Sequence, residues 1–198
     1  MSSLSVYHIS SLDLPNKVLT HGEDITATLA EHGVRFERWP AAAKVQAGAS
    51  QDEVVGAYQQ QIEQLMSERG YDRVEVLSVS GDQPSAPPHE QRHEQDVVRL
   101  FVMGRGLFNL HIDDYIYAVL CEKNDLLLLP AGIKHWFDSG ERPHFMAIRL
   151  FSAADGAVAH VTGQGDGFSL GIQSLLRNQD FSKHSNCNGS KQECNCCP

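Results

Sequence analysis

Short runs of β-branched, aromatic and aliphatic residues follow one another between Arg73 and Phe151, with turn sequences between them. The turns include GRG, DD, KND and PAG, and the runs are RVEVLSVS, VVRLFVMG, GLFNLHI, YIYAVLCE, DLLLLP and HFMAIRLF. Closely spaced runs of strand-forming residues are typical of an antiparallel sandwich or a small β-barrel. No other feature of the sequence restricts the fold as strongly.

The part of the chain before these runs predicts helices and two extended pieces. SVYHIS and VRFERW are typical of strands, and apolar residues recur at helical spacing from Glu23 until Gly33. The clearest helix is SQDEVVGAYQQQIEQLMSERG, because Ser50 and Glu53 form a capping box at its start and Gly70 closes it. We therefore expect an α+β protein in which N-terminal helices pack on one flank of an antiparallel β-barrel.

Length and charge narrow the classes of function. A chain of 198 residues with 41% hydrophobic residues is large enough for one domain with a real core. The formal net charge of −9 disfavours nucleic acid or an anionic membrane as a partner. No apolar run reaches the length of a membrane span, and the start MSSLSVYHISS lacks a basic end followed by an apolar stretch. We expect a cytoplasmic monomer.

The cysteines are concentrated at the C-terminal end. Cys121 lies in the body of the chain, whereas the last dozen residues contain Cys187, Cys194, Cys196 and Cys197. Two interpretations stay open: a reduced, solvent-exposed tail, or a tail that binds a soft metal or undergoes redox chemistry. The spacing matches no zinc ribbon. We expect one domain over residues 1–163 and a flexible Cys-rich tail over residues 164–198.

The sequence H-E-x-x-H occurs from His89 to His93. On a helix this spacing places two imidazoles on one face to bind zinc, with Glu90 as the general base of a peptidase. However, the stretch after it, VVRLFV, is rich in strand formers, and in a strand residues four apart are separated by about 13 Å. Residues two apart share a strand face, which favours Gln91 and His93 as joint ligands with a third from another strand.

From Val98 to Phe151 the chain resembles the acireductone dioxygenase family of the cupin superfamily. The resemblance rests on RLFVMGRGLF from Arg99, LHIDDYIYAVLCEKNDL from Leu110, PAGIKHWFDSG from Pro130 and PHFMAIRLF from Pro143. The N-terminal VYHIS, the HGEDI helix start and the long helix also fit, so the resemblance covers about residues 1–163. It implies a cupin-type antiparallel barrel, the double-stranded β-helix.

The resemblance also implies a reaction. Members of this family hold one Fe(2+) or Ni(2+) ion with three histidines and one glutamate, and cleave an enediol with O2. The substrate is 1,2-dihydroxy-3-keto-5-methylthiopentene, an intermediate of methionine salvage. The iron form releases formate and a keto acid, and the nickel form gives a different product set that includes carbon monoxide.

The family's ligand pattern H-x-H-x-x-x-E-V-R aligns with residues 91–99. His93 matches the second histidine and His135 matches the third, whereas Gln91 stands in place of the first histidine and Val97 in place of the glutamate. A glutamine carbonyl is a poorer donor than imidazole for these metals, and valine removes both a ligand and its charge. The expected metal ligands are therefore His93, His135 and Gln91.

Neighbouring carboxylates do not replace the missing one in an extended strand. Glu94 and Asp96 alternate to the face opposite His93 unless a bulge turns one of them inward. The sequence thus leaves two functions open: a dioxygenase with a weakened metal site, or a non-catalytic cupin that binds a small anion or a protein partner.

Three further positions match functional residues of the family. Arg99 matches the arginine that steadies the substrate enediolate, and we expect it to be catalytic. Phe137 matches the aromatic residue that packs over bound substrate, and Arg149 is expected to join it in substrate binding. Against the pattern, Ala157 replaces a tryptophan and the segment between residues 80 and 89 is shortened, which predicts a more open pocket.

Overall fold

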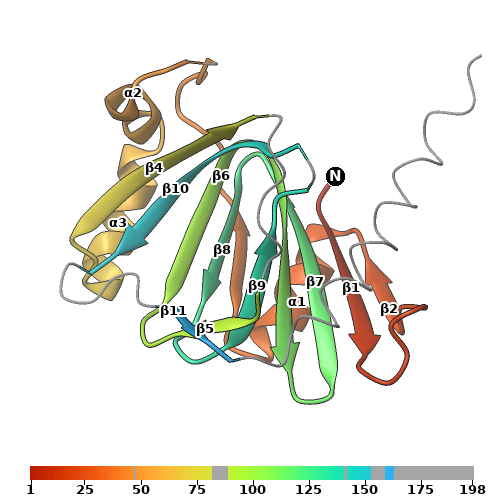
Figure 1. The fold of residues 1–198 in the computed structure, drawn as a ribbon. Helices are drawn as coiled ribbons and strands as arrows, with labels where there is room; N and C mark the ends of the chain where they lie inside the picture. The colour runs from red at the N-terminus through yellow and green to blue at the C-terminus, as the bar shows by residue number, and fades with distance from the viewer. Residues whose placement is uncertain (47, 82–88, 141, 153–158, 163–198) are drawn as a thin grey trace, which may run out of the picture.

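The computed structural model describes residues 1–162 except 47, 82–88, 141 and 153–158. The predictions about Ala157, the shortened segment and the C-terminal cysteines lie outside the described residues. Within them the chain forms strands that all pair antiparallel, with three helices on one side (Figure 1). None of the described helices is long and apolar enough to cross a membrane.

The strands form two layers that share one long strand, β6 (Val97–Ile112). The first sheet has the order β11 (Ala159–Val161), β5 (Gln91–His93), β9 (Lys134–Asp138), β6, β7 (Tyr115–Glu122), β1 (Ser3–His8) and β2 (Lys17–Leu19). The second sheet has the order β4 (Arg73–Ser80), β10 (His144–Phe151), β6, β8 (Asp125–Leu129) and β3 (Arg35–Arg38). No pairing among the described residues joins the outer strands, so the barrel is open at its side.

Strand β6 corrects one sequence prediction. The GRG sequence was expected to be a turn between two strands, yet β6 runs through it without a break. Gly104 has a φ of +73°, and a Cβ there would lie 2.1 Å from the His144 carbonyl oxygen. A Cβ on Gly106 would lie 2.3 Å from Cε2 of Phe137. The glycines therefore let β6 bend sharply and pass from the second sheet to the first.

The inner core fills the space between the two sheets. Its buried side chains come from both sheets and from helix α1 (Gly22–Ala30), which contributes Ile25 and Leu29. Phe101 and Ala147 of the second sheet face Phe108 of the first within this core. The register of β6 and β10 shifts between Met146 and Ala147, but the strands are regular from Phe101 back to Val97 and from Ala147 to Phe151. Because strand residues alternate between faces, residues two positions away within these regular stretches point toward the interior as well.

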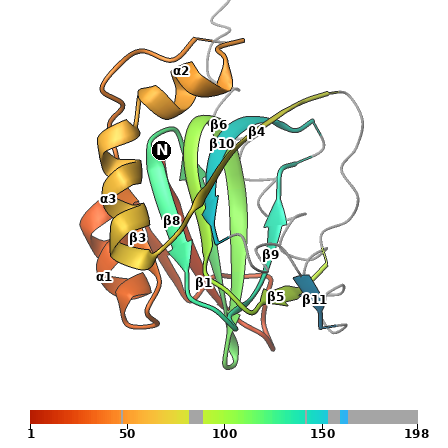
Figure 2. The same ribbon diagram turned by 90° about the vertical axis from the view of Figure 1, so that its left-hand side faces the viewer.

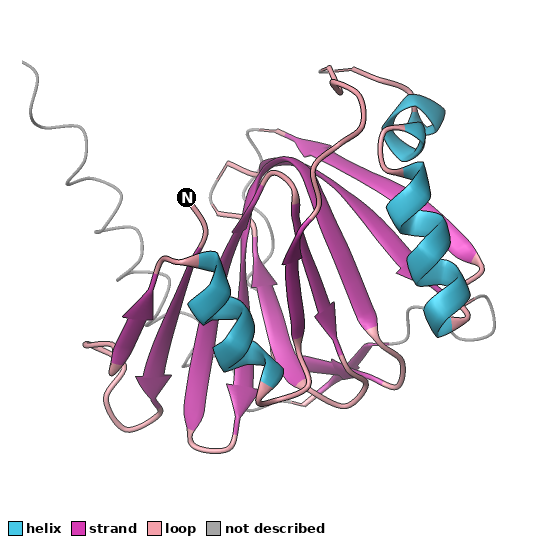
Figure 3. Ribbon diagram, turned by 180° about the vertical axis from the view of Figure 1, so that it is seen from behind, coloured by secondary structure: helices cyan, strands magenta, loops and turns pink. Residues whose placement is uncertain are grey.

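Two helices cover the outer face of the second sheet (Figures 2 and 3). They are α2 (Gln51–Gly56) and α3 (Gln59–Arg69), where the sequence predicted one continuous helix. The capping box of Ser50 and Glu53 is present, and Gly70 ends α3 in the left-handed conformation, as predicted. The helix breaks at Tyr58, whose ring is fully buried and whose hydroxyl donates a hydrogen bond to Asn124 Oδ1 at 2.9 Å. Burial of this side chain against the barrel outweighs local helix continuity.

Candidate metal and anion site at the barrel mouth

The H-E-x-x-H segment is not helical. Gln91 to His93 form β5, in which Gln91 pairs with His135 of β9 and His93 pairs with Ala159 of β11. Glu90 faces away from His93, since its carboxylate accepts a hydrogen bond from His111. The zinc peptidase interpretation is therefore wrong, because the helix that it requires does not exist.

Two histidines from different strands meet at the mouth of the barrel. The rings of His93 and His135 are stacked, with centroids 5.3 Å apart and planes inclined by 24°. His135 is only 2% exposed, and the ring of Phe108 lies 6.5 Å away from it. Gln91 lies on the same side of β5 as His93 and is the Cα partner of His135. The three side chains expected as metal ligands thus come together.

The hydrogen bond of His135 determines its tautomer. Nδ1 lies 2.9 Å from the carbonyl oxygen of Ile133, which can only accept, so Nδ1 carries the proton and Nε2 keeps its lone pair. The pKa of His135 is lowered to about 4, mainly by burial; the charges of His93 and Arg99 also lower it, and the hydrogen bond to Ile133 opposes this by raising it. The pKa of His93 is lowered in the same way, first by burial and then by Arg99 and Arg149. Both imidazoles are therefore neutral near pH 7.

Arg99 and Arg149 are direct cross-strand partners on β6 and β10. Arg99 is two residues from Phe101 and Arg149 is two residues from Ala147, so both arginines lie on the inner face. Arg149 Nη1 contacts Glu75 Oε2 at 3.2 Å, and Arg99 Nη1 donates to the Val98 carbonyl oxygen at 3.1 Å. Burial lowers the pKa of Arg99 to about 9, and the charge of Arg149 adds to this effect.

Phe137 belongs to an aromatic cluster that lines the interior beside His135. Its ring lies 4.8 Å from that of Phe108, 5.3 Å from that of Phe145 and 6.3 Å from that of Phe101. The edge of the Phe137 ring occupies the space that a Cβ on Gly106 would need, so only glycine fits at this position without a shift. The ring can therefore serve as an apolar wall of the mouth as well as a core residue.

No carboxylate of the described residues joins the two imidazoles. Glu94 is exposed and pairs with His160 Nε2 at 3.2 Å, while Asp96 accepts hydrogen bonds from the Tyr71 hydroxyl at 2.8 Å and the Ala131 amide at 3.2 Å. Across the described part of the chain no group of three or more His, Cys, Asp or Glu side chains could hold a metal ion. The residues present do not fit a four-ligand centre of three histidines and one glutamate.

The buried pair of Glu90 and His111 could not be identified from the sequence. Glu90 has a fully buried carboxylate with Oε2 2.6 Å from Nδ1 of His111, and Thr162 also donates to this carboxylate. The motif instead suggested Glu90 as a peptidase base, and His111 has no local context in its strand. The partners lie 21 and 72 residues away along the chain, and no local pattern connects them.

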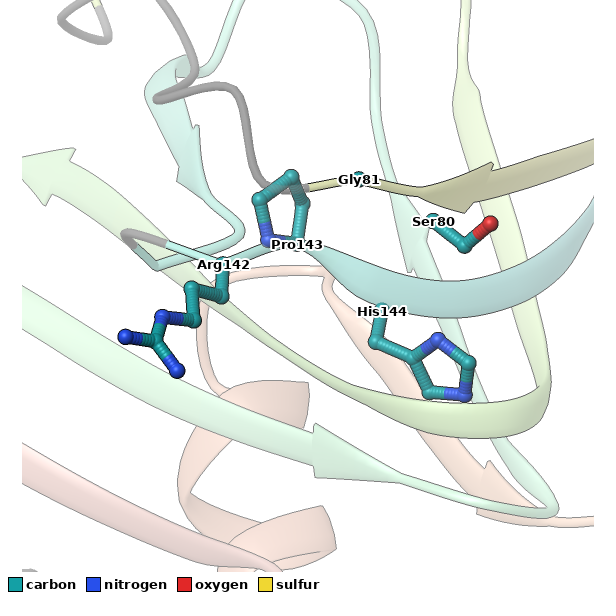
Figure 4. A pocket seen from close by; sticks show the side chains of 5 residues that line it. All are labelled: Ser80, Gly81, Arg142, Pro143 and His144. Carbon is teal, nitrogen blue, oxygen red and sulfur yellow. The ribbon is translucent and has the colours of Figure 1, made fainter.

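A separate hollow of about 310 Å³ lies at the other end of the second sheet (Figure 4). It is lined by Ser80, Gly81, Arg142, Pro143 and His144. His144 begins β10, whereas Arg149 is five residues further along the strand, or about 17 Å at the usual rise. This hollow is therefore distinct from the mouth that holds the histidines.

Comparisons with known proteins identify the family of this chain. The model of the ARD/ARD′ family matches residues 13–159. Acireductone dioxygenase from Pseudomonas fluorescens strain Pf0-1 is 64% identical over 170 residues, which cover 83% of this chain and 94% of that protein. The chain belongs to the ARD/ARD′ family. Acireductone dioxygenase from Pseudomonas aeruginosa strain PAO1 is 57% identical over 169 residues, covering 82% of this chain and 93% of that protein.

A solved structure supports the same fold. Acireductone dioxygenase from Bacillus anthracis, with a cadmium ion in its active centre, superposes with a TM-score of 0.68. Its sequence is 23% identical, and the match covers 81% of this chain and 98% of that one. The cupin-type α+β fold and the acireductone dioxygenase family, both predicted from the sequence, are confirmed. The family is metal-dependent.

Proposed function

We propose that this protein acts on the substrate class of its family, a small enediol, at the mouth formed by β5, β6, β9 and β10. Arg99 is the catalytic cation, with Phe137 and Arg149 as substrate-binding residues. The observation that supports this proposal is the convergence of two stacked imidazoles and two cross-strand guanidinium groups. The charge of Arg99 lowers the pKa of both His93 and His135, so these groups share one local field.

The chemistry of these side chains suits an enediol. In the metal-free site the Nε2 lone pair of His135 can accept a hydrogen bond from an enediol hydroxyl, because Nδ1 is already committed to Ile133. With an ion bound, the same lone pair would hold the ion instead. The planar guanidinium groups of Arg99 and Arg149 can neutralise the enediolate form of the substrate and orient its two oxygens. Phe137 offers an apolar surface for the methylthio-bearing end of the substrate.

Cleavage of the substrate by O2, as in the relatives, would in addition require Fe(2+) or Ni(2+). His93, His135 and Gln91 are the donors that we assign to this ion, and they include no carboxylate. Loss of a partner that only orients a ligand typically costs 10 to 100-fold in metal affinity. The loss of two direct ligands is therefore expected to cost more than about 100-fold.

One observation favours a second candidate, a cupin without dioxygenase activity. Val97 packs against the inner core at the place of the family's glutamate, and no other carboxylate of the described residues stands in for it. In either case we place the function in residues 1–163 of a cytoplasmic monomer that binds neither nucleic acid nor membranes. The net charge of −9 supports the last two points.

Metal analysis combined with oxygen uptake tests the proposal. The full chain, purified after growth with Fe(2+) or Ni(2+), is assayed for bound metal and for O2 consumption with an anaerobically prepared enediol. We expect uptake that depends on added metal and disappears in His135→Ala. Absence of uptake at saturating concentrations of both metals would leave the non-catalytic cupin as the function.

A further inference from the structure

Three charged residues form one row across the second sheet. Glu75 of β4 pairs with Arg149 of β10, and Arg149 pairs in turn with Arg99 of β6. Like charges that lie directly opposite on neighbouring strands destabilise a sheet. Glu75 contacts Arg149 and can balance only one of the two positive charges. The row therefore carries an uncompensated positive charge on the inner side of the barrel.

The two guanidinium groups also have hydrogen-bonding capacity to spare. Among the described residues Arg149 Nε is buried without a hydrogen-bond partner, and Arg99 donates a hydrogen bond to the carbonyl oxygen of Val98. An arginine has five N–H donors in a fixed planar arrangement. Buried polar groups without acceptors are costly, so this arrangement favours an added ligand that brings acceptor oxygens.

Among the described residues, the neighbouring side chains do not supply the missing negative charge. His93 and His135 carry no acidic group, and the carboxylates of Asp96 and Glu90 are bonded to Tyr71 and His111. Val97, two residues before Arg99 on the same face, presents a partly buried methyl surface to the inner core. The carboxylate that the family pattern places there would have faced the same interior.

We propose that the mouth of this barrel binds a small planar anion with two pairs of acceptor oxygens between Arg99 and Arg149, without a metal ion. Dicarboxylates and enediolates are the chemical class, because two adjacent oxygens on each side match the guanidinium geometry. The choice of this class rests on the proposed function; metal-free binding does not. Valine at position 97, where the family pattern has a glutamate, removes a negative charge from the site, which weakens its attraction for a cation and favours an anion.

Calorimetric titration with squarate tests this inference. Squarate is a planar dianion at pH 7 with adjacent enediolate oxygens, and acetate serves as a singly charged comparison. The full chain is freed of metal on a chelating resin, checked for residual metal, and titrated at low ionic strength. We expect saturable binding of one squarate per chain and weaker binding of acetate.

Two variants and one control show where the anion binds. Arg99→Met is expected to weaken squarate binding by about tenfold or more, since hydrogen bonds to charged groups are among the strong ones. Arg142→Met removes an exposed arginine from the distant hollow and is expected to leave the affinity within about twofold. Val97→Glu places a negative charge beside the arginines and should weaken metal-free binding by about tenfold or more.

The outcomes are distinct from those of the oxygen assay. Squarate binding that appears only after addition of Fe(2+) or Ni(2+) overturns the inference, as does equal affinity in Arg99→Met or in Val97→Glu. Because Arg99→Met removes a repulsion between like charges, its melting temperature without ligand should not fall. Should that variant fail to fold, Val97→Glu still decides the matter. A protein without dioxygenase activity that binds squarate refutes the proposed reaction and supports this inference.

Discussion

Glu90 Oε2 lies 2.6 Å from Nδ1 of His111, and this contact fastens the start of β5 to β6 on the face opposite His93. The backbone amide of Thr162 adds a hydrogen bond to the Glu90 carbonyl oxygen at 3.1 Å, and Lys134 Nζ lies 4.0 Å from Oε1. Burial raises the pKa of Glu90, but the hydrogen bonds from Thr162 and His111 outweigh it and hold the pKa below its ordinary value. The short strand that carries His93 is thus held by a buried charged cluster.

Replacement of Glu90 by Gln should reduce the free energy of unfolding by about 1 to 3 kcal/mol, because the buried donors lose a charged acceptor. Urea denaturation at pH 7 measures the change. Since the folded protein has the lower pKa, the carboxylate's contribution is present above pH 4.5, the unfolded value, and is lost as the pH falls through the folded value. Glu94→Gln is the control, because that side chain is 77% exposed. Equal losses in the two variants would refute the role of the cluster.

The double substitution Gln91→His and Val97→Glu should convert the weak metal site of the parent chain into a tight one. It supplies an imidazole and a carboxylate beside His93 and His135, and we expect Fe(2+) or Ni(2+) affinity to rise more than about 100-fold. Equilibrium dialysis with elemental analysis measures the bound metal, which His135→Ala in the same background should remove. The exposed residue His144, at the far end of the barrel, provides a control as His144→Ala. Tight stoichiometric metal in the parent chain would contradict the prediction.

The buried imidazole of His135 predicts a pH dependence of stability in the metal-free protein. Its pKa of about 4 in the fold lies below the ordinary value of 6.5, so the unfolded chain binds the proton more readily. The free energy of unfolding should therefore fall as the pH is lowered from 6.5 to about 4 and show no further loss from this group below that. Denaturant titrations across this range measure the slope. A His135→Gln chain with the same slope as the parent would show that another group is responsible.

Gly106→Ala should displace Phe137 from the mouth. The added methyl group would lie 2.3 Å from Cε2 of that ring, and overpacking of this kind typically costs about 1 to 3 kcal/mol. Denaturation measures the loss, and squarate titration reports whether the mouth changes with the ring. Gly56→Ala is the matched control, because a Cβ there meets nothing within 4 Å. A loss no larger than that of the control would mean that Phe137 moves aside freely.

Local patterns predicted most of the elements, and the misses have physical causes. Strands such as β7 and β10 follow directly from their runs of strand-forming residues. The break between α2 and α3 was missed because burial of Tyr58 depends on Asn124, a residue far along the chain. The GRG sequence was misread as a turn because glycine serves equally well in a turn and in a sharply bent strand.

The sequence predicted the donor side chains of the candidate site, but not the side chains that contact them. Alternation along β5 puts Gln91 and His93 on one face, as predicted. Glu94 and Asp96, which the sequence suggested would alternate along an extended strand, lie instead in the bend between β5 and β6 and are bonded elsewhere. The convergence of His93 with His135 followed from the family resemblance rather than from spacing. The pairing of Glu90 with His111 followed from neither.

The sequence alone determined which chemical groups are available: two imidazoles, an amide and a valine at the four positions that the family resemblance suggests as ligands, and two arginines on strands nearby. Strand periodicity also determined which of them share a face, because side chains alternate at every residue. Only the tertiary structure decided that Arg99 and Arg149 lie directly opposite each other and that no described carboxylate joins the histidines. Charge balance depends on distances through space between strands, and these are set by sheet pairing rather than by neighbours in the chain.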